Sequence, residues 1–225
     1  MRNRQIFAGY FVEGPTDARF LEGILRKSLL DIAFECTSQI DVELFLIEID
    51  KQGLSFVEQV ELVANEGLND YGIDFLFVHT DADNSTIDNA LRHKIDPAIA
   101  SLMQKPDEGY CKKVVPVIPV YMTEAWMLAD KELLKEEIGT ELSDNQLGIN
   151  RSPESIANPK EIIESAIRIA REKRTKRRRH DLIIGELYSP IGAKVELGNL
   201  KRLDSFNQFN IRLKQVFVEL GLLHE

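Results

Sequence analysis

Residues 77–86 have the sequence FVHTDADNST, in which a hydrophobic run ends in two aspartates. The preceding residues, DFLFVHT, have the length and composition of a buried strand. Asp81 and Asp83 follow with one residue between them. Like charges at the end of a buried strand repel each other and lose hydration, and both effects cost free energy. A divalent cation such as Mg²⁺ or Mn²⁺ would offset that cost, because such ions prefer oxygen ligands. The alternative is a polar turn that caps the next helix.

Further hydrophobic segments on either side of this stretch also have the character of strands: QIFAGYFVEG, VELFLIEID and KKVVPVIPVYMTE. Segments with a helical period separate them. The helix after the aspartates is predicted to start with a capping box, Ser85-x-x-Asp88, and to be interrupted near Pro97. This alternation predicts an α/β fold, with a four-stranded parallel sheet flanked by helices.

The strand-like segments end near residue 130. We therefore predict a domain over residues 1–130 and a mostly helical C-terminal extension over residues 131–225. In the extension, Asn158-Pro159 is expected to open a helix, because proline is favoured in the first helical turn. Trp126, the only tryptophan, is expected to pack its helix against the sheet.

The charge of the chain is uneven. Its formal net charge is −9, yet a basic tract lies between Arg171 and His180. This tract would contact a phosphate backbone, or it is a solvated helix end or loop. The candidate nucleic-acid-binding residues are Arg174, Lys176, Arg177, Arg178 and Arg179. A mainly acidic chain with one basic block would bind nucleic acid locally or with help from a partner.

The remaining composition is that of a globular protein in a reducing compartment. The hydrophobic content is 44% and the charged content 29%, and no apolar run has the length of a membrane span. The first residues meet a glutamate too early for a signal peptide. Cys36 and Cys111 have no metal-binding spacing and suggest no disulfide framework, so we expect a cytoplasmic location.

Acidic residues follow three of the predicted strands. Glu13 follows the first, Asp81 and Asp83 the third, and Glu124 the fourth. Parallel strands would bring these side chains to one edge of the sheet, where ligands bind in folds of this kind. The group would repel itself unless a cation lay among its members. Individually, Glu13 could instead be a surface turn residue, and Glu124 could cap or salt-bridge its own helix.

These motifs resemble a known superfamily. VEGPTDARFL followed by FLFVHTDAD is similar to the Toprim domain of topoisomerases, DnaG-type primases and OLD-family nucleases, which carries a glutamate after its first strand and a D-x-D after its third. The segment PVIPVYMTEAWMLADKE resembles more closely the small bacterial Toprim-like proteins of the DUF4276 family, as do NPKEII and FNQFNIRL. The resemblance implies a Toprim/Rossmann-like fold for roughly the first 130 residues.

The same resemblance implies an activity. Glu13 would act as general acid or base or as a metal ligand, and Asp81 and Asp83 would hold Mg²⁺ or Mn²⁺, with Glu124 as a possible further ligand. The chain would then be a metal-dependent nuclease that cleaves DNA or RNA. Related small Toprim proteins are often encoded with AAA or ABC-type ATPases in anti-phage systems, so the resemblance also implies a defence effector controlled by an ATPase partner.

Two other classes of function remain open. A Toprim-like fold could bind nucleic acid or a partner without cutting. A D-x-D after a strand also occurs in phosphatases and glycosyltransferases. The phosphatase pattern places its aspartates after the first strand, whereas here they follow the third, and the glycosyltransferase pattern does not account for Glu13.

Overall fold

The computed structural model describes residues 4–172 and 182–224. The predicted nucleic-acid-binding residues, Arg174 and Lys176 to Arg179, lie outside the described residues. The strands are β1 (Arg4–Phe11), β2 (Ile40–Leu46), β3 (Phe75–His79) and β4 (Val114–Val117). The helices are α1 (Pro15–Ala33), α2 (Phe56–Tyr71), α3 (Asp88–Ala90), η1 (Leu91–Ile95), α4 (Asp96–Gln104), α5 (Glu124–Met127), α6 (Lys131–Ile138), α7 (Asp144–Leu147), η2 (Pro153–Ser155), α8 (Pro159–Arg171), η4 (Ile184–Glu186), α9 (Tyr188–Lys194), α10 (Leu197–Leu200) and α11 (Asp204–Glu219).

The strands form one parallel sheet in the order β2-β1-β3-β4. Ala8 of β1 is level with Leu44 of β2 and with Phe75 of β3, and Leu76 of β3 is level with Val114 of β4. All four carboxyl ends therefore lie at the same edge. The predicted α/β fold with a four-stranded parallel sheet is confirmed.

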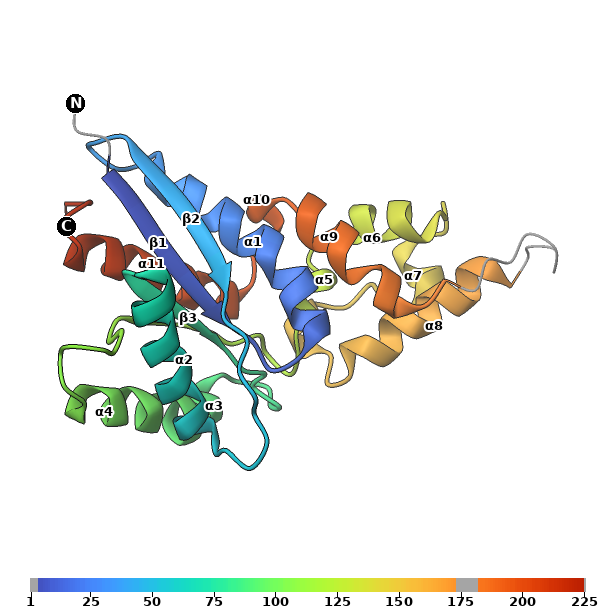
Figure 1. The fold of residues 1–225 in the computed structure, drawn as a ribbon. Coiled ribbons are helices and arrows are strands. Elements are labelled where there is room, and N and C mark those ends of the chain that lie inside the picture. Colours follow the sequence, from blue (N-terminus) through green and yellow to red (C-terminus); the bar gives the residue numbers. More distant parts are fainter. Residues whose placement is uncertain (1–3, 173–181, 225) are drawn as a thin grey trace.

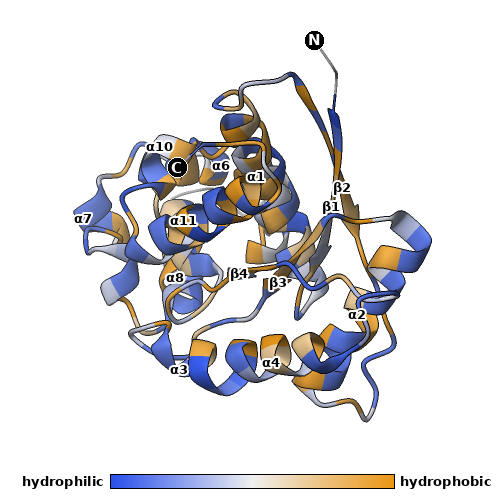
Figure 2. Ribbon diagram, turned by 90° about the vertical axis from the view of Figure 1, so that its left-hand side faces the viewer, coloured by the Kyte–Doolittle hydropathy of each residue, from blue (hydrophilic) through white to orange (hydrophobic). Residues whose placement is uncertain are grey.

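Helices cover both faces of the sheet. Figure 1 shows α2 and α4 on one side of the strands and α1, α9 and α11 on the other, and the turned view in Figure 2 separates the same two layers. The side chains of β3 alternate accordingly. Phe75 and Phe77 belong to the hydrophobic cluster under α1 and α11, while Leu76 and Val78 belong to the cluster under α2 and α4. Alternating faces with both sides apolar are typical of a buried parallel strand.

The C-terminal helices share the core of the sheet. Trp126 is fully buried and packs against Phe206 and Phe209 of α11, with ring centroids 5.1 and 6.1 Å away. Phe209 also lies 5.9 Å from the ring of Phe77 in β3. The indole N–H of Trp126 donates a 2.8 Å hydrogen bond to the hydroxyl of Ser205. Trp126 therefore anchors its helix as predicted.

Helices α1 and α9 approach each other through two glycines. A Cβ added to Gly192 would lie 2.1 Å from the carbonyl oxygen of Phe20, and one added to Gly23 would lie 2.6 Å from the carbonyl oxygen of Gly192. Real side chains do not tolerate such distances. The two hydrogen-only side chains therefore allow α9 to lie directly against the helix that follows β1.

The helical segment after β3 starts differently from the predicted helix. The capping box at Ser85 is wrong, because the Ser85 hydroxyl donates to Asn84 Oδ1 (3.2 Å), and α3 begins after Ile87 without a side-chain cap. The interruption near Pro97 is confirmed as the π-helical turn η1, in which the N–H of Asp96 bonds to the carbonyl of Leu91. Proline has no N–H to continue the α-helical pattern, which favours such a widened turn.

The predicted start of a helix in the C-terminal part is also confirmed. Helix α8 begins at Pro159, and the Asn158 side chain accepts a hydrogen bond from the N–H of Glu161. Helix α11 ends at Glu219, followed by Gly221 with a φ of 70°. No helix within residues 4–172 and 182–224 is both long enough and apolar enough to cross a membrane.

Candidate functional site

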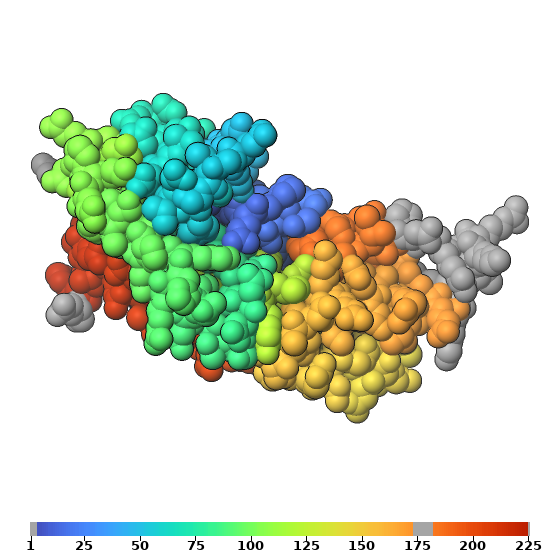
Figure 3. Space-filling model, turned by 90° about the horizontal axis from the view of Figure 1, so that it is seen from below, coloured from blue at the N-terminus to red at the C-terminus, as the bar shows by residue number. Residues whose placement is uncertain are grey.

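The strand order places a topological switch point between β1 and β3. The chain leaves β1 through α1 on one face of the sheet and returns to β3 through α2 on the other face. Ligands of open α/β sheets bind beyond the carboxyl ends of the strands at such a switch point. Glu13 follows β1 and Thr80 follows β3 at this position. In Figure 3 the segments after β1, β3 and β4 adjoin on this face, coloured blue, green and yellow-green.

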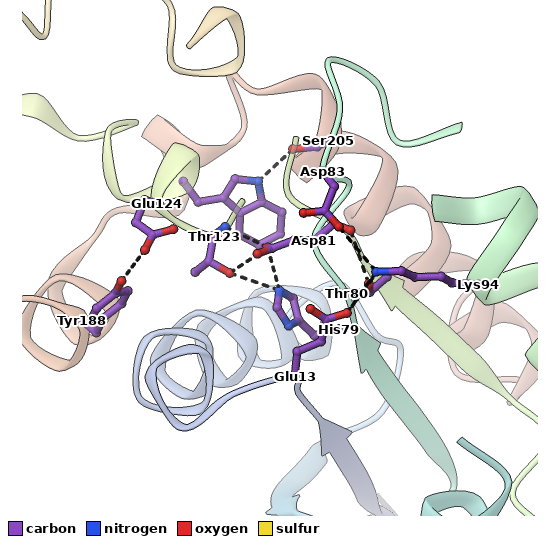
Figure 4. A network of polar contacts seen from close by, with 11 residues as sticks. Glu13, His79, Thr80, Asp81, Asp83, Lys94, Thr123, Glu124, Tyr188 and Ser205 are labelled. Atoms are coloured by element: carbon purple, nitrogen blue, oxygen red, sulfur yellow. Dashed lines mark hydrogen bonds and ion pairs between the residues drawn. The ribbon is translucent and has the colours of Figure 1, made fainter. Parts of the chain in front are cut away.

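One group of polar side chains converges on a lysine, and we call it the Lys94 cluster: Glu13, Thr80, Asp83 and Lys94 (Figure 4). The Lys94 ammonium lies 2.7 Å from Thr80 Oγ1, 3.2 Å from Glu13 Oε1 and 3.7 Å from Asp83 Oδ2. The hydroxyl of Thr80 donates to Glu13 Oε1 at 2.5 Å. Thr80 is fully buried, so its hydroxyl is held in place between the Glu13 carboxylate and the Lys94 ammonium.

A second group surrounds Asp81, and we call it the Thr123 cluster: His79, Asp81 and Thr123. Asp81 Oδ1 accepts hydrogen bonds from the backbone N–H of Thr123 at 2.9 Å and from its hydroxyl at 3.3 Å. The same hydroxyl lies 3.1 Å from His79 Nε2, which is 3.4 Å from Asp81 Oδ1. Thr123 is the N-cap residue of α5. Asp81, which follows β3, therefore accepts a hydrogen bond from the N-cap residue of α5, the helix that follows β4.

Backbone contacts hold the loops after β3 and β4 together. The N–H of Asp83 donates to the carbonyl of Tyr121 at 2.9 Å, and the N–H of Tyr121 donates to the carbonyl of Asn84 at 2.9 Å. Asp83 and Tyr121 both have a left-handed backbone, with φ values of 52° and 59°. Aspartate tolerates this conformation better than most residues. The turn directs the exposed Asp83 carboxylate toward Lys94.

Glu124 lies apart from both clusters. Its carboxylate accepts a hydrogen bond from the hydroxyl of Tyr188 at the start of α9, and both side chains are buried. Burial raises the pKa of Glu124, although the Tyr188 hydrogen bond opposes the shift. Figure 4 shows the pair on the far side of Thr123 from Lys94. Glu124 is therefore held by the C-terminal helices.

Asp17 adds a further carboxylate from the first turn of α1. Burial raises its pKa above the usual value; His79 opposes this shift, and Asp81 adds to it. The raised pKa of Asp17 therefore reflects mainly the burial of its carboxyl group, with the nearby Asp81 charge as a smaller cause.

The structure thus brings together some of the predicted acids. Glu13 and Asp83 face one cation, Asp81 lies beside them in the Thr123 cluster, and Glu124 faces Tyr188. Within the described ranges, no three His, Cys, Asp or Glu side chains are arranged so as to hold a metal ion.

Comparison with known protein families assigns the chain to one of them. The model of DUF4276, a domain of unknown function, matches residues 12–213. The chain belongs to the DUF4276 family. No curated protein matches it significantly, and no solved structure does.

The matched region of this DUF4276 member includes every acid of the candidate site. Their donor atoms are of the right type for Mg²⁺ or Mn²⁺, because carboxylate and hydroxyl oxygens are the ligands these ions prefer. The Lys94 ammonium lies among the oxygens of Glu13, Thr80 and Asp83. These oxygens already surround one cation, the ammonium. A divalent cation could bind at the same position once the ammonium has moved away.

Three residues of the site carry no recognisable signal in the DUF4276 sequence, and a fourth, Lys94, has only an indirect one. Thr80 and Thr123 are ordinary strand-end and turn residues by type, and Tyr188 lies 64 positions from Glu124. Lys94 lies 14 positions from Thr80, which it contacts. The signal that could have identified Lys94 is Pro97, since the proline marks the widened turn from which the lysine extends.

Proposed function

We propose that this chain is a metal-dependent phosphodiesterase with a Toprim-type site, acting on DNA or RNA. One observation carries the proposal: oxygens of Glu13, Thr80 and Asp83, which follow two adjacent strands, surround a single cationic position at the switch point of the sheet. A divalent ion bound at that edge would support metal-dependent hydrolysis of a phosphodiester.

The side chains divide the work in this proposal. Glu13 and Asp83 would hold a divalent ion, with Asp81 beside it. When bound, such an ion neutralises phosphate charge and activates water. Thr80 fixes the orientation of the Glu13 carboxylate through its 2.5 Å hydrogen bond. His79 and Thr123 orient Asp81.

The distribution of charge along the chain supports the proposed substrate and partner. The basic residues Arg174 and Lys176 to Arg179 would contact nucleic acid, and the acidic remainder of the chain favours help from a second protein. We propose that an ATPase of the AAA or ABC type supplies this help in an anti-phage system, as the resemblance to small Toprim proteins implies.

A second candidate function is binding without cleavage. It is favoured by Lys94, which already neutralises part of the acidic charge at this edge. In that case the fold would serve as a nucleic-acid-binding or partner-binding regulator that cleaves no polynucleotide.

The test is a cleavage assay on single- and double-stranded DNA and RNA, with Mn²⁺ and with EDTA. Cleavage is expected only with Mn²⁺, and Glu13→Gln and Asp83→Asn should each reduce it by a factor of about 10²–10⁴. Glu48→Gln is the matched control, because Glu48 is an exposed acid that follows β2 at the same edge. Stoichiometric Mn²⁺ binding without cleavage, also in the presence of the partner, would support the binding function.

A further inference from the structure

We propose that Lys94 is an exchangeable internal counter-ion that holds the cation position of the acidic site and must leave it before a divalent ion binds. This inference rests on the proposed function to the extent that the function requires a divalent ion at Glu13 and Asp83. It adds a competition between a side chain and the metal.

The contacts of Lys94 support an occupied cation position. Its ammonium is within 3.7 Å of oxygens from Glu13, Thr80 and Asp83. The Thr80 hydroxyl donates its proton to Glu13, so the oxygen lone pairs remain for Lys94. A divalent ion coordinated by the same oxygens would be a few ångströms from the ammonium, where two positive charges repel strongly. The two cations therefore exclude each other.

The lysine is held loosely enough to exchange. Its side chain is 33% exposed, and the side chains of the two acids that it faces are 39% exposed for Glu13 and 74% exposed for Asp83. Exposed ion pairs contribute little to stability, because water and salt screen them. Lysine also carries its charge on a flexible four-carbon stem. The ammonium can therefore move into solvent and exchange its 2.7 Å hydrogen bond with Thr80 for contacts with water.

The local backbone explains why a lysine reaches this point. Lys94 lies in the π-helical turn η1, between Ala90 and Asp96. A π turn adds a residue to the helical turn and changes the direction of the side chains that it carries, and such turns are frequent at functional sites. The nearby Pro97 favours this turn by its missing N–H. The position of Lys94 therefore depends on a local irregularity of the helix between β3 and β4.

The test measures the affinity for Mn²⁺ alone by isothermal titration calorimetry at fixed ionic strength. Lys94→Met should bind Mn²⁺ about threefold to tenfold more tightly than the unmodified chain, the size expected when a modest ion pair no longer competes. Lys94→Arg keeps the charge and should show no such gain. Unchanged or weaker binding by Lys94→Met would overturn the competition and leave the metal site itself intact.

Lys51→Met is the control for a general change of charge. The Lys51 ammonium donates to the carbonyl oxygens of Val12 at 2.6 Å and Glu13 at 2.9 Å, so it is as near to the Glu13 loop as Lys94 is. These contacts are to the backbone and not to a carboxylate. An equal gain in affinity for Lys51→Met and Lys94→Met would indicate long-range electrostatics and overturn the proposal.

Melting temperatures measured without metal distinguish an exchangeable Lys94 from a fixed counter-ion. In EDTA, Lys94→Met should melt at a lower temperature than the unmodified chain, because the carboxylates of Glu13 and Asp83 lose their counter-ion. Mn²⁺ binding by Lys94→Met but not by the unmodified chain would support the proposal in its strongest form. If neither protein binds Mn²⁺, the metal-dependent function fails, and a lower melting temperature in EDTA would then identify Lys94 as a fixed counter-ion and overturn the exchange.

Discussion

The hydroxyl of Tyr188 donates a hydrogen bond to the carboxylate of Glu124, across 64 positions of sequence. This contact joins the short helix after β4 to the start of α9, and α9 in turn lies against α1 through Gly192 and Gly23. Burial raises the pKa of Glu124 and also that of Tyr188. The C-terminal helices thus supply the environment of an acid that follows a strand of the sheet.

The raised pKa of Glu124 gives a pH dependence that Glu124→Gln should remove. The folded chain binds this proton more tightly than the unfolded chain, so the contribution of Glu124 to stability is greatest below the usual glutamate pKa, about 4.3. That contribution is lost as the pH rises from there through the raised pKa. The free energy of unfolding of Glu124→Gln, relative to the unmodified chain, should therefore increase as the pH rises from the usual glutamate pKa through the raised pKa of Glu124.

Urea denaturation in EDTA at a series of pH values measures this difference. Tyr188→Phe is a useful companion, because it keeps the ring and removes the hydroxyl that opposes the shift, so its stability should fall more steeply over the same range. A relative stability of Glu124→Gln that decreases with pH would mean that the folded protein favours the Glu124 anion.

The contact between α1 and α9 predicts a large effect from one methyl group. A Cβ at position 192 would lie 2.1 Å from the carbonyl oxygen of Phe20, so Gly192→Ala must separate the helices. We expect a loss of about 1–3 kcal/mol or more in the free energy of unfolding. Gly198→Ala in α10 is the matched control, since nothing lies within 4 Å of the added Cβ. It should gain about 0.4–1 kcal/mol. Equal effects of the two substitutions would contradict the close approach.

The Trp126–Ser205 hydrogen bond predicts a coupling between two buried residues. Ser205→Ala leaves the indole N–H of Trp126 without its 2.8 Å partner in the core, which should cost about 1–3 kcal/mol. Trp126→Phe removes the N–H, so Ser205→Ala should cost clearly less in that background. Thermal or urea melts of the four proteins complete a double-mutant cycle. Additive effects would show that the bond contributes nothing.

The strands and their direction could be predicted because their signals are local. DFLFVHT is apolar on both faces, as a central parallel strand must be, and it became β3 between β1 and β4. From the same local pattern, Glu13, Asp81 and Asp83 could be expected at one edge. The strand order itself has no local signal, since it depends on which face of the sheet each helix covers.

The remaining features depend on contacts between distant residues. The N–H groups of Asp204 and Ser205 at the start of α11 are bound by Glu154, about 50 positions earlier. The expected cap at Ser85 failed because the neighbouring Asn84 side chain binds both the N–H and the hydroxyl of that serine. Local patterns predict which residues can cap a helix, and tertiary packing selects among them.

The last prediction separates the two aspartates of FVHTDADNST. Asp81 has a structural partner in the N–H of Thr123, whereas the Asp83 side chain is 74% exposed and lies 3.7 Å from the Lys94 ammonium. In EDTA, Asp81→Ala should lose about 0.5–1.5 kcal/mol, the net contribution of a typical hydrogen bond, because the N–H of Thr123 loses its partner. Asp83→Asn should change stability by less than about 0.5 kcal/mol, because asparagine also tolerates the left-handed backbone.

Thermal melts with added Mn²⁺ then test both residues as ligands. The unmodified chain should gain about 2.7 kcal/mol at a hundredfold excess over the dissociation constant, and each variant should gain much less. If Asp81→Ala loses stability in EDTA yet keeps the full gain from Mn²⁺, Asp81 is a structural partner of Thr123 and not a ligand. If Asp83→Asn keeps the gain as well, the carboxylates after β3 do not bind the ion, because the exposed Asp83 has no other role that could mask its loss.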